Sequence, residues 1–294
     1  MKYLLFLLIV LLSCNNGEKL NSQTKENIIS YNQFMSGIQL PETLTLCGEK
    51  IPLEDEEIRE RAEREFYLLL QQPGQVILYL KRAGRYFDMY EEEIKKAGMP
   101  DDLKYLSVAE SALFQARSSV GAIGLWQFMK ETGQKMGLYI DDLVDERRHP
   151  QKSTVAALKY LRQGYQSHKS WLLTLAGYNM GHTGIKESLA FQSANDYFDL
   201  FLNEETSRFI FRIAIIKEIM SNPNKYGFDL NKIVTYKPER VKLIKVASAI
   251  PDLAQWAKNN GTNYKAVKLL NPWILKRQLQ TPKSGFWDIA VPAK

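Results

Sequence analysis

Apolar residues recur at every third or fourth position through most of the chain between residues 52 and 221, which is the spacing of amphipathic helices. Gly and Pro interrupt this pattern at residues 73–74, 84, 98–100 and 222–223. The pattern therefore predicts helices over residues 53–72, 76–83, 86–97, 101–110, 153–166, 171–178 and 204–220, and another helix that begins at residue 124. Up to residue 220 the predicted fold is almost all α.

The pattern changes after residues 231–240, where the composition shifts. Beyond this segment it predicts a strand over 241–246, helices over 253–259 and 264–270, and a strand over 287–291. No internal repeat is evident. The fold class that follows is mainly α, with a small C-terminal α/β module.

The first residues resemble an export signal. Met1-Lys2 gives a positive start, residues 3–12 are apolar, and Ser13-Cys14 follows directly. Such a run is too short for a transmembrane helix and is typical of a signal peptide. Leu11 to Cys14 resembles the bacterial lipobox, which implies removal of residues 1–13 and lipidation of Cys14. The alternative is a plain signal peptide with an incidental cysteine. Residues 14–50 are then a tether and N-terminal segment.

Composition and charge narrow the function classes. The 294 residues are 45% hydrophobic and 24% charged, which predicts a packed core rather than disorder. The formal charge is +6, but no dense block of Lys and Arg indicates nucleic acid, so a mildly basic solvated surface is the simpler interpretation.

Cysteine and histidine usage predicts neither a disulfide nor a metal site. If Cys14 carries lipid, Cys47 is the one cysteine left, and we interpret it as a small structural residue. The three histidines (His149, His168 and His182) are scattered without a metal-ligand spacing. No cofactor is expected.

Glu110 is the candidate for acid chemistry. It ends the predicted helix 101–110 among Leu106, Val108 and Leu113. Apolar neighbours and a helix C-terminus both disfavour the ionised carboxylate and raise its pKa. A raised pKa is what a proton donor to a glycosidic oxygen needs. The alternative is a glutamate on the exposed face of the helix.

The usual glycosidase needs two carboxylates, and the loop after Glu110 holds none. The next acid, Glu131, is expected on a solvated helix face, while Asp141, Asp142 and Asp145 come later and would have to reach back. The sequence thus fits a mechanism that needs one acid better than one that needs two.

Four short motifs carry a family resemblance: Glu110-Ser111, Ser118 with Gly121, Gly124-Leu125-Trp126-Gln127, and Gly177-Tyr178-Asn179. In combination they resemble the motifs of lytic murein transglycosylases, in the goose-lysozyme-like branch of glycoside hydrolases. The third motif and the segment from 98 to 111 are most similar to the membrane-bound lytic transglycosylase D type. The resemblance covers roughly residues 50 to 225. It implies a helical flanking region at 51–98 and a lysozyme-like catalytic domain at 99–225.

The resemblance also implies a role for each residue. Glu110 donates a proton to the oxygen between N-acetylmuramic acid and N-acetylglucosamine, then acts as base on the C6 hydroxyl, so that a 1,6-anhydro sugar forms without water. Ser118, Gln127, Tyr178 and Asn179 match positions that hold the sugar or orient the glutamate. Trp126 either offers an aromatic face to a sugar ring or fills core.

The sequence departs from the family pattern in three ways. The first is that the loop between Glu110 and Ser118 is one residue shorter, and the second is that Phe114-Gln115 stands where the family has Asn-Pro. Ser118 rather than Ser119 is chosen by its spacing to Gln127.

The third departure is Gly177, which stands where the family has Ala. Two further features concern residues outside the four motifs. Asp145, Arg147 and Arg148 are interpreted as capping or pairing residues between helices. His182 either edges the groove or lies on the surface.

Residues 235–294 resemble a degenerate LysM-like module, through Leu253, Trp256, the run from 269 to 272 and the final strand. LysM modules bind N-acetylglucosamine-containing glycans. The opening Gly-Asp turn of the module is missing, so binding and a purely structural role both stay open.

The sequence as a whole predicts a monomeric lytic transglycosylase with peptidoglycan strands as its partner. The lipid anchor implies a periplasmic lipoprotein, and Asn15 rather than Asp after Cys14 favours the outer membrane. The alternatives are a hydrolytic muramidase and a catalytically silent glycan-binding lipoprotein.

Overall fold

The computed structural model describes residues 33–293. The chain divides into two units, Met1–Pro41 and Glu42–Lys294, and in the first the described residues form a short helical stretch at 33–37. The predicted signal peptide, Cys14 and the first part of the tether lie outside the described residues. Every element named below belongs to the second unit.

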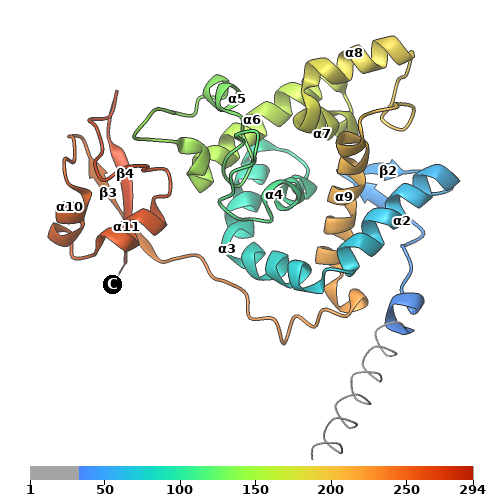
Figure 1. The fold of residues 1–294 in the computed structure, drawn as a ribbon, viewed down its shortest axis with the longest axis horizontal. Coiled ribbons are helices and arrows are strands. Elements are labelled where there is room, and N and C mark those ends of the chain that lie inside the picture. The colour runs from blue at the N-terminus through green and yellow to red at the C-terminus, as the bar shows by residue number, and fades with distance from the viewer. Residues whose placement is uncertain (1–32, 294) are drawn as a thin grey trace, which may run out of the picture. The chain divides into compact units, whose positions relative to one another are not determined.

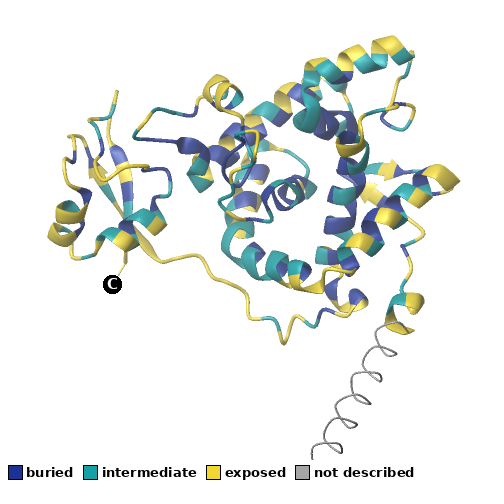
Figure 2. Cartoon of the chain, viewed as in Figure 1, coloured by how far each residue is buried: buried dark blue, intermediate teal, exposed yellow. Residues whose placement is uncertain are grey.

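Helices make up most of the second unit (Figure 1). They are α2 (Glu56–Leu70), α3 (Pro73–Ala97), α4 (Lys104–Ser111), α5 (Lys130–Lys135), α6 (Pro150–His168), α7 (Trp171–Met180), α8 (His182–Gln192) and α9 (Glu204–Ser221), with short 3₁₀ helices at Asp101–Leu103, Glu146–Arg148 and Pro223–Tyr226. Figure 1 shows α4 at the centre of this helical region, and α3 and α9 pack against it. Its residues Leu106, Ser107 and Val108 are completely buried, and Figure 2 shows the same central burial.

The prediction of two helices over 76–83 and 86–97 is wrong, because α3 is continuous through Gly84. Gly84 allows the segment that leads to the C-terminal module to pack closely against α3. A Cβ on residue 84 would lie 2.7 Å from Cβ of Thr235 in that segment. A glycine inside a helix costs about 1 kcal/mol. Burial of apolar residues on both sides of it, such as Leu80 and Ile94, outweighs that cost.

The helix predicted from residue 124 begins only at Lys130. Residues 117–128 instead form a small loop structure with β-bridges that pair Ile123 with Arg117 and with Phe128. Gly124 has φ +88°, and a Cβ there would lie 2.1 Å from the carbonyl oxygen of Arg147. The positive φ and this contact exclude a regular helix at Gly124.

A β-hairpin and one helix have no clear pattern in the sequence. Strands β1 (Leu44–Leu46) and β2 (Glu49–Ile51) form a hairpin whose two-residue turn, Cys47-Gly48, has positive φ at both positions. With three residues each, they are too short to show an alternating pattern. Helix α8 was likewise not predicted, because Ile185 is its one buried residue.

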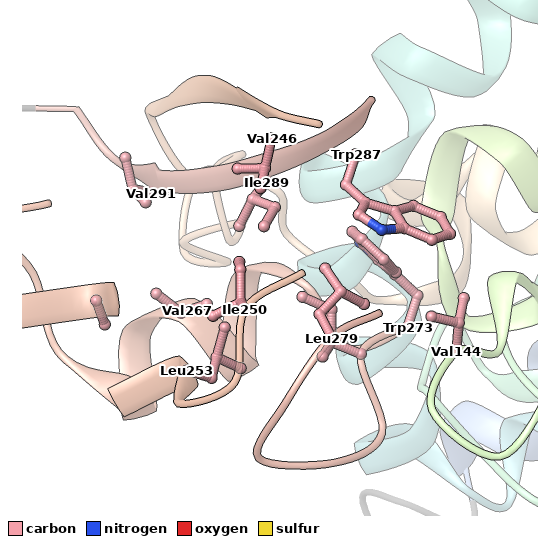
Figure 3. Close-up of a cluster of buried hydrophobic side chains, with 12 residues drawn as sticks. Val144, Val246, Ile250, Leu253, Val267, Trp273, Leu279, Trp287, Ile289 and Val291 are labelled. Atoms are coloured by element: carbon pink, nitrogen blue, oxygen red, sulfur yellow. The ribbon is translucent and has the colours of Figure 1, made fainter. Parts of the chain in front are cut away.

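The C-terminal module has the predicted elements in the predicted order. Strand β3 (Val241–Val246) pairs antiparallel with β4 (Trp287–Pro292), and α10 (Leu253–Asn259) and α11 (Tyr264–Leu270) lie between them in the chain. Figure 3 shows the apolar core of the module, in which the rings of Trp273 and Trp287 lie next to Val144 of the helical region. Main-chain hydrogen bonds from Asp145 to Trp273 and from Leu275 to Leu143 join the two parts.

Candidate active site

A cavity of about 380 Å³ opens above the C-terminal end of α4. Its lining comes from α4, the 118–132 segment, α6, α7 and the start of α9: Glu110, Ser118, Val120, Ala122, Gln127, Phe128, Met129, Thr132, Tyr160, Tyr178, Asn179 and Glu205. The structure thus places five of the six predicted catalytic and sugar-binding residues around one cavity. We refer to it as the Glu110 pocket.

Helix α4 is fixed to the loop that faces it by buried hydroxyl groups. Ser107 and Ser111 both donate hydrogen bonds to the carbonyl oxygen of Leu125, at 2.9 and 2.8 Å. The hydroxyl of Tyr90 lies 2.9 Å from that of Ser107. Directly after the helix, Ala112 adopts the left-handed conformation with φ 54°. The chain therefore turns away just past Glu110, which leaves the carboxyl group at the cavity wall.

The Glu110 carboxyl group is partly buried, and in residues 33–293 no hydrogen-bond donor partners it. Burial first, and then the negative charge of Glu205, raise its pKa from the ordinary 4.5 to about 8, with the positive charge of Arg212 partly offsetting them. Glu110 is therefore largely protonated at neutral pH. A protonated carboxyl group that faces a cavity can act as a general acid.

Tyr178 and Asn179 lie in the last turn of α7, on the pocket wall. The Tyr178 hydroxyl donates a hydrogen bond to the carbonyl oxygen of Trp126 at 2.7 Å, which ties α7 to the loop that holds α4. The Asn179 amide donates to a carboxylate oxygen of Glu205 at 3.2 Å and accepts from the hydroxyl of Thr206 at 2.8 Å. Both side chains are thereby held in fixed orientations.

Ser118 and Gln127 complete the opposite wall. The Ser118 hydroxyl accepts a hydrogen bond from the main-chain N–H of Ala122 at 3.0 Å, whereas Ser119 is exposed and does not line the pocket. Gln127 has φ +48°, and its amide donates to the carbonyl oxygen of Gly124 at 2.7 Å. The short loop after Glu110 therefore still places a serine in the pocket.

Trp126 does not line the pocket, so the sugar-stacking role does not fit its position. Its side chain is completely buried, its indole N–H donates to the hydroxyl of Thr154 at 2.9 Å, and its ring packs 5.1 Å from that of Tyr90. This position corresponds to the other reading, in which Trp126 fills core. Its contribution to the pocket is the main-chain oxygen that holds Tyr178.

Glu205 is the pocket residue that sequence reasoning missed. It lies in the first turn of α9, far along the chain from Glu110, where an acid is ordinary because it complements the helix dipole. Of the later acids considered as partners, none lines the pocket. Asp145 instead makes a two-bonded ion pair with Arg147, at 2.9 and 2.8 Å. No local signal in the sequence distinguishes Glu205 from other first-turn acids.

Replacing Glu205 by Gln is expected to lower the pKa of Glu110, because it removes a negative charge that disfavours ionisation. A reaction that needs protonated Glu110 slows as the pH rises past its pKa, and in the variant this decline should occur at a lower pH than in the wild type. Glu205 is exposed, so screening should keep the shift to about one pH unit or less. The pH profile of kcat/KM measures it. Glu204→Gln, one residue earlier and outside the pocket, is the control, and an unmoved Glu205→Gln profile would contradict this coupling.

Gly177 is explained by His182. A Cβ on Gly177 would lie 2.2 Å from Nδ1 of the His182 imidazole, so the alanine usual in the family does not fit here. The His182 ring packs 4.7 Å from Tyr160, a pocket residue. Burial lowers the pKa of His182 to about 4, so it is neutral. His182 thus supports the pocket wall from behind.

Among residues 33–293 no group of three or more His, Cys, Asp or Glu side chains is arranged to hold a metal ion. None of the helices described here is long and apolar enough to cross a membrane.

Comparisons with known proteins match both parts of the chain. Residues 88–201 match the family described as "Transglycosylase SLT domain", and residues 242–294 match "Soluble lytic transglycosylase C-terminal LysM-like domain". The chain is also similar to "Membrane-bound lytic murein transglycosylase D" of two Escherichia coli strains, K12 and an O6:H1 strain. It is 30% identical to each over 219 residues, which are 72% of this chain and 47% of the relative. It therefore spans about half the length of these curated relatives.

Among solved structures, an inactive mutant of lytic transglycosylase Slt from Pseudomonas aeruginosa matches with a TM-score of 0.36 and 22% identity. The match covers 51% of this chain and 25% of that one. The two family matches, rather than this one, bear on the assignment. The chain thus contains a transglycosylase SLT domain at residues 88–201, within its lysozyme-like helical region, and a soluble lytic transglycosylase C-terminal LysM-like domain at residues 242–294.

Proposed function

We propose that this protein is a lytic transglycosylase that cleaves the β-1,4 bond between N-acetylmuramic acid and N-acetylglucosamine in peptidoglycan. The observation that carries the proposal is Glu110, a carboxyl group at the wall of a cavity that meets no hydrogen-bond donor within residues 33–293 and whose pKa is raised to about 8. The SLT family match and the name of the Escherichia coli relatives support the same substrate.

One group with this pKa suits both proton transfers. At neutral pH Glu110 is protonated and donates its proton to the glycosidic oxygen as the bond to the leaving sugar breaks. The resulting carboxylate is a stronger base than an ordinary glutamate, because its conjugate acid has the higher pKa. It then takes the proton from the C6 hydroxyl, which closes onto C1 and gives the 1,6-anhydro product.

The other pocket residues hold the reacting parts in place. Tyr178 is committed to the Trp126 carbonyl, so its role is to fix the pocket wall rather than to transfer a proton. Asn179 and Ser118 offer polar groups on two sides of the cavity for a sugar's hydroxyl and amide groups. Burial is the main reason why Glu110 stays protonated, and the negative charge of Glu205 adds to it.

Mass spectrometry of digested peptidoglycan tests the proposal. We expect muropeptides that end in 1,6-anhydro-N-acetylmuramic acid. Fragments with reducing ends would instead assign the protein to hydrolytic muramidases, a second candidate that the presence of Glu205 in the pocket favours, because hydrolysis commonly uses two carboxylates. If no fragments were released, the protein would be a silent glycan-binding lipoprotein and the proposed reaction would be wrong.

We also propose that Cys14 carries the lipid that anchors the protein in the outer membrane, on the periplasmic side. Replacing Cys14 by Ser should abolish the incorporation of a labelled fatty acid into the protein, because no thiol remains at the site of lipidation. Metabolic labelling followed by immunoprecipitation measures this, with Cys47→Ser as the control. If Cys14→Ser still incorporated the label, the lipid would have to be attached elsewhere.

A further inference from the structure

A second and larger cavity, of about 900 Å³, lies between the helical region and the C-terminal module. We call it the inter-module cavity. Its lining includes residues of α3, the loop after α4, the start of α6, the connecting segment at 236–239, and the C-terminal module from β3 onward. It shares no lining residue with the Glu110 pocket. The substrate groove proposed above therefore does not account for it.

Cations that form no ion pair with a carboxylate line this cavity, together with two acidic residues, Glu239 and Asp288. Arg82, Arg85 and Lys268 line it, and none of them makes an ion pair with a carboxylate anywhere in residues 33–293. Arg148 likewise has no ion pair, and its charge lowers the pKa of Lys268 together with burial, the larger cause. Arg82 and Lys268 each donate a hydrogen bond to a main-chain carbonyl oxygen, which does not neutralise their charge. A bound anion would therefore stabilise these half-buried cations.

Buried polar atoms at the same place also lack partners. Nε of Arg85, Oε1 of Gln115 and Nε of Arg148 are buried, and none has a hydrogen-bond partner among the described residues. Arg85 and Gln115 line the cavity. Most buried polar groups in proteins are paired, so two unpaired ones in the lining of one cavity fit a site for a polar ligand.

Aromatic side chains form the rest of the recognition surface. Tyr86, Phe114, Tyr236, Trp273 and Trp287 line the cavity. Arg82 lies over the ring of Phe114 at 5.4 Å, and Arg85 lies over the ring of Tyr236 at 5.3 Å. Apolar flat faces beside cations suit a ligand that combines an apolar ring face with carboxylate groups. A plain inorganic anion would not use the aromatic faces.

The Phe114-Gln115 departure from the family pattern falls at this cavity. Both residues line it, and neither lines the Glu110 pocket. Arg82 also donates a hydrogen bond of 3.0 Å to the carbonyl oxygen of Ala112, two residues after Glu110. The segment that ends α4 is therefore shared between the two cavities.

We propose that the inter-module cavity is a second, non-catalytic site that binds a carboxylate-bearing glycopeptide, the amino sugar with its acidic peptide of a peptidoglycan strand. The sugar ring lies against the aromatic side chains, and the carboxylates pair with Arg85 and Lys268. The identity of the ligand rests on the proposed function, whereas the site itself rests on the charges and aromatic faces described above.

Binding is tested on the full-length Glu110→Gln protein, so that no cleavage occurs. The probe is N-acetylmuramyl-L-alanyl-D-isoglutamine, titrated into ¹⁵N-labelled protein. We expect the indole signals of Trp273 and Trp287, at the cavity, to shift, while that of Trp171 at the start of α7 stays in place. Adding Arg85→Gln and Lys268→Gln should weaken binding at least tenfold. The matched control is Lys258→Gln with Lys265→Gln, two exposed lysines of the module outside the cavity.

Three results would overturn the proposal. They are unchanged affinity in the Arg85 and Lys268 variant, equal shifts with the neutral trimer of N-acetylglucosamine, and equal affinity for the dipeptide without its sugar. Product analysis of the wild-type enzyme is independent of this titration. If the wild-type products had reducing ends, or if no products formed, the proposed reaction would be wrong, and the binding result would be unaffected.

Discussion

Replacing Glu110 by Gln is expected to lower the rate of peptidoglycan cleavage by about a thousandfold or more. Glutamine has nearly the same shape but can neither donate the proton to the glycosidic oxygen nor take one from the C6 hydroxyl. Because the proposed mechanism uses this group twice, both steps are lost together. Release of soluble muropeptides, quantified by mass spectrometry, measures the effect.

The same substitution should stabilise the fold at neutral pH, which separates loss of chemistry from loss of structure. In the folded protein Glu110 has a pKa of about 8, above the ordinary 4.5 of the unfolded chain. Its contribution to stability is therefore fully present below about pH 4.5 and is lost as the pH rises to about 8. Glutamine has no charge to bury and removes this loss. The melting temperature of Glu110→Gln should therefore exceed that of the wild type at pH 8 by a few degrees, and the difference should vanish near pH 4.5.

The control is Glu131→Gln, which removes an exposed carboxylate on α5 outside the pocket and should change neither activity nor the pH dependence of stability. If Glu110→Gln kept more than about a tenth of the wild-type rate, Glu110 would not be the proton donor. If its melting temperature showed the wild-type pH dependence, the raised pKa would not belong to this group.

Replacing Gly124 by Ala is expected to destabilise the protein by about 3–5 kcal/mol and to abolish most activity. The added Cβ would meet the carbonyl oxygen of Arg147 at 2.1 Å, a main-chain atom that cannot rotate away. Arg147 is itself fixed by Asp145 and donates to the carbonyl oxygen of Phe128 at 3.0 Å. The loop must therefore move, and with it the Leu125 oxygen that anchors α4.

Gly121→Ala is the matched control, because Gly121 has nearly the same φ, +89°, but nothing lies within 4 Å of its added Cβ. It should cost only the backbone strain of about 1–2 kcal/mol. Denaturant unfolding of both variants gives the free energies of unfolding. Equal destabilisation of the two would mean that the contact with Arg147 is not what requires glycine at 124.

Elements with a strong local pattern were the ones that the sequence predicted well. Strand β3 and helices α10 and α11 have the predicted bounds. The two helices combine helical spacing with a capping residue, Asp252 for α10 and Asn263 for α11. The break predicted at Gly84 failed, because a local helix-breaking tendency says nothing of the segment packed against it. The start of α5 failed for the same kind of reason, since contacts of Gly124 with Arg147 fix the preceding loop.

The sequence alone was sufficient to predict the mainly α fold, the C-terminal module and the single most important candidate, Glu110. The first two depend on neighbours within a few positions, through helical spacing and strand patterns. Glu110 was singled out by its apolar neighbours together with the resemblance of the four motifs to a known family. The tertiary structure decided that Trp126 lies in the core and that Glu205 faces Glu110, and it formed the inter-module cavity. Burial and charge pairing depend on which distant segments pack together, and the spacing of residues along the chain carries no record of that.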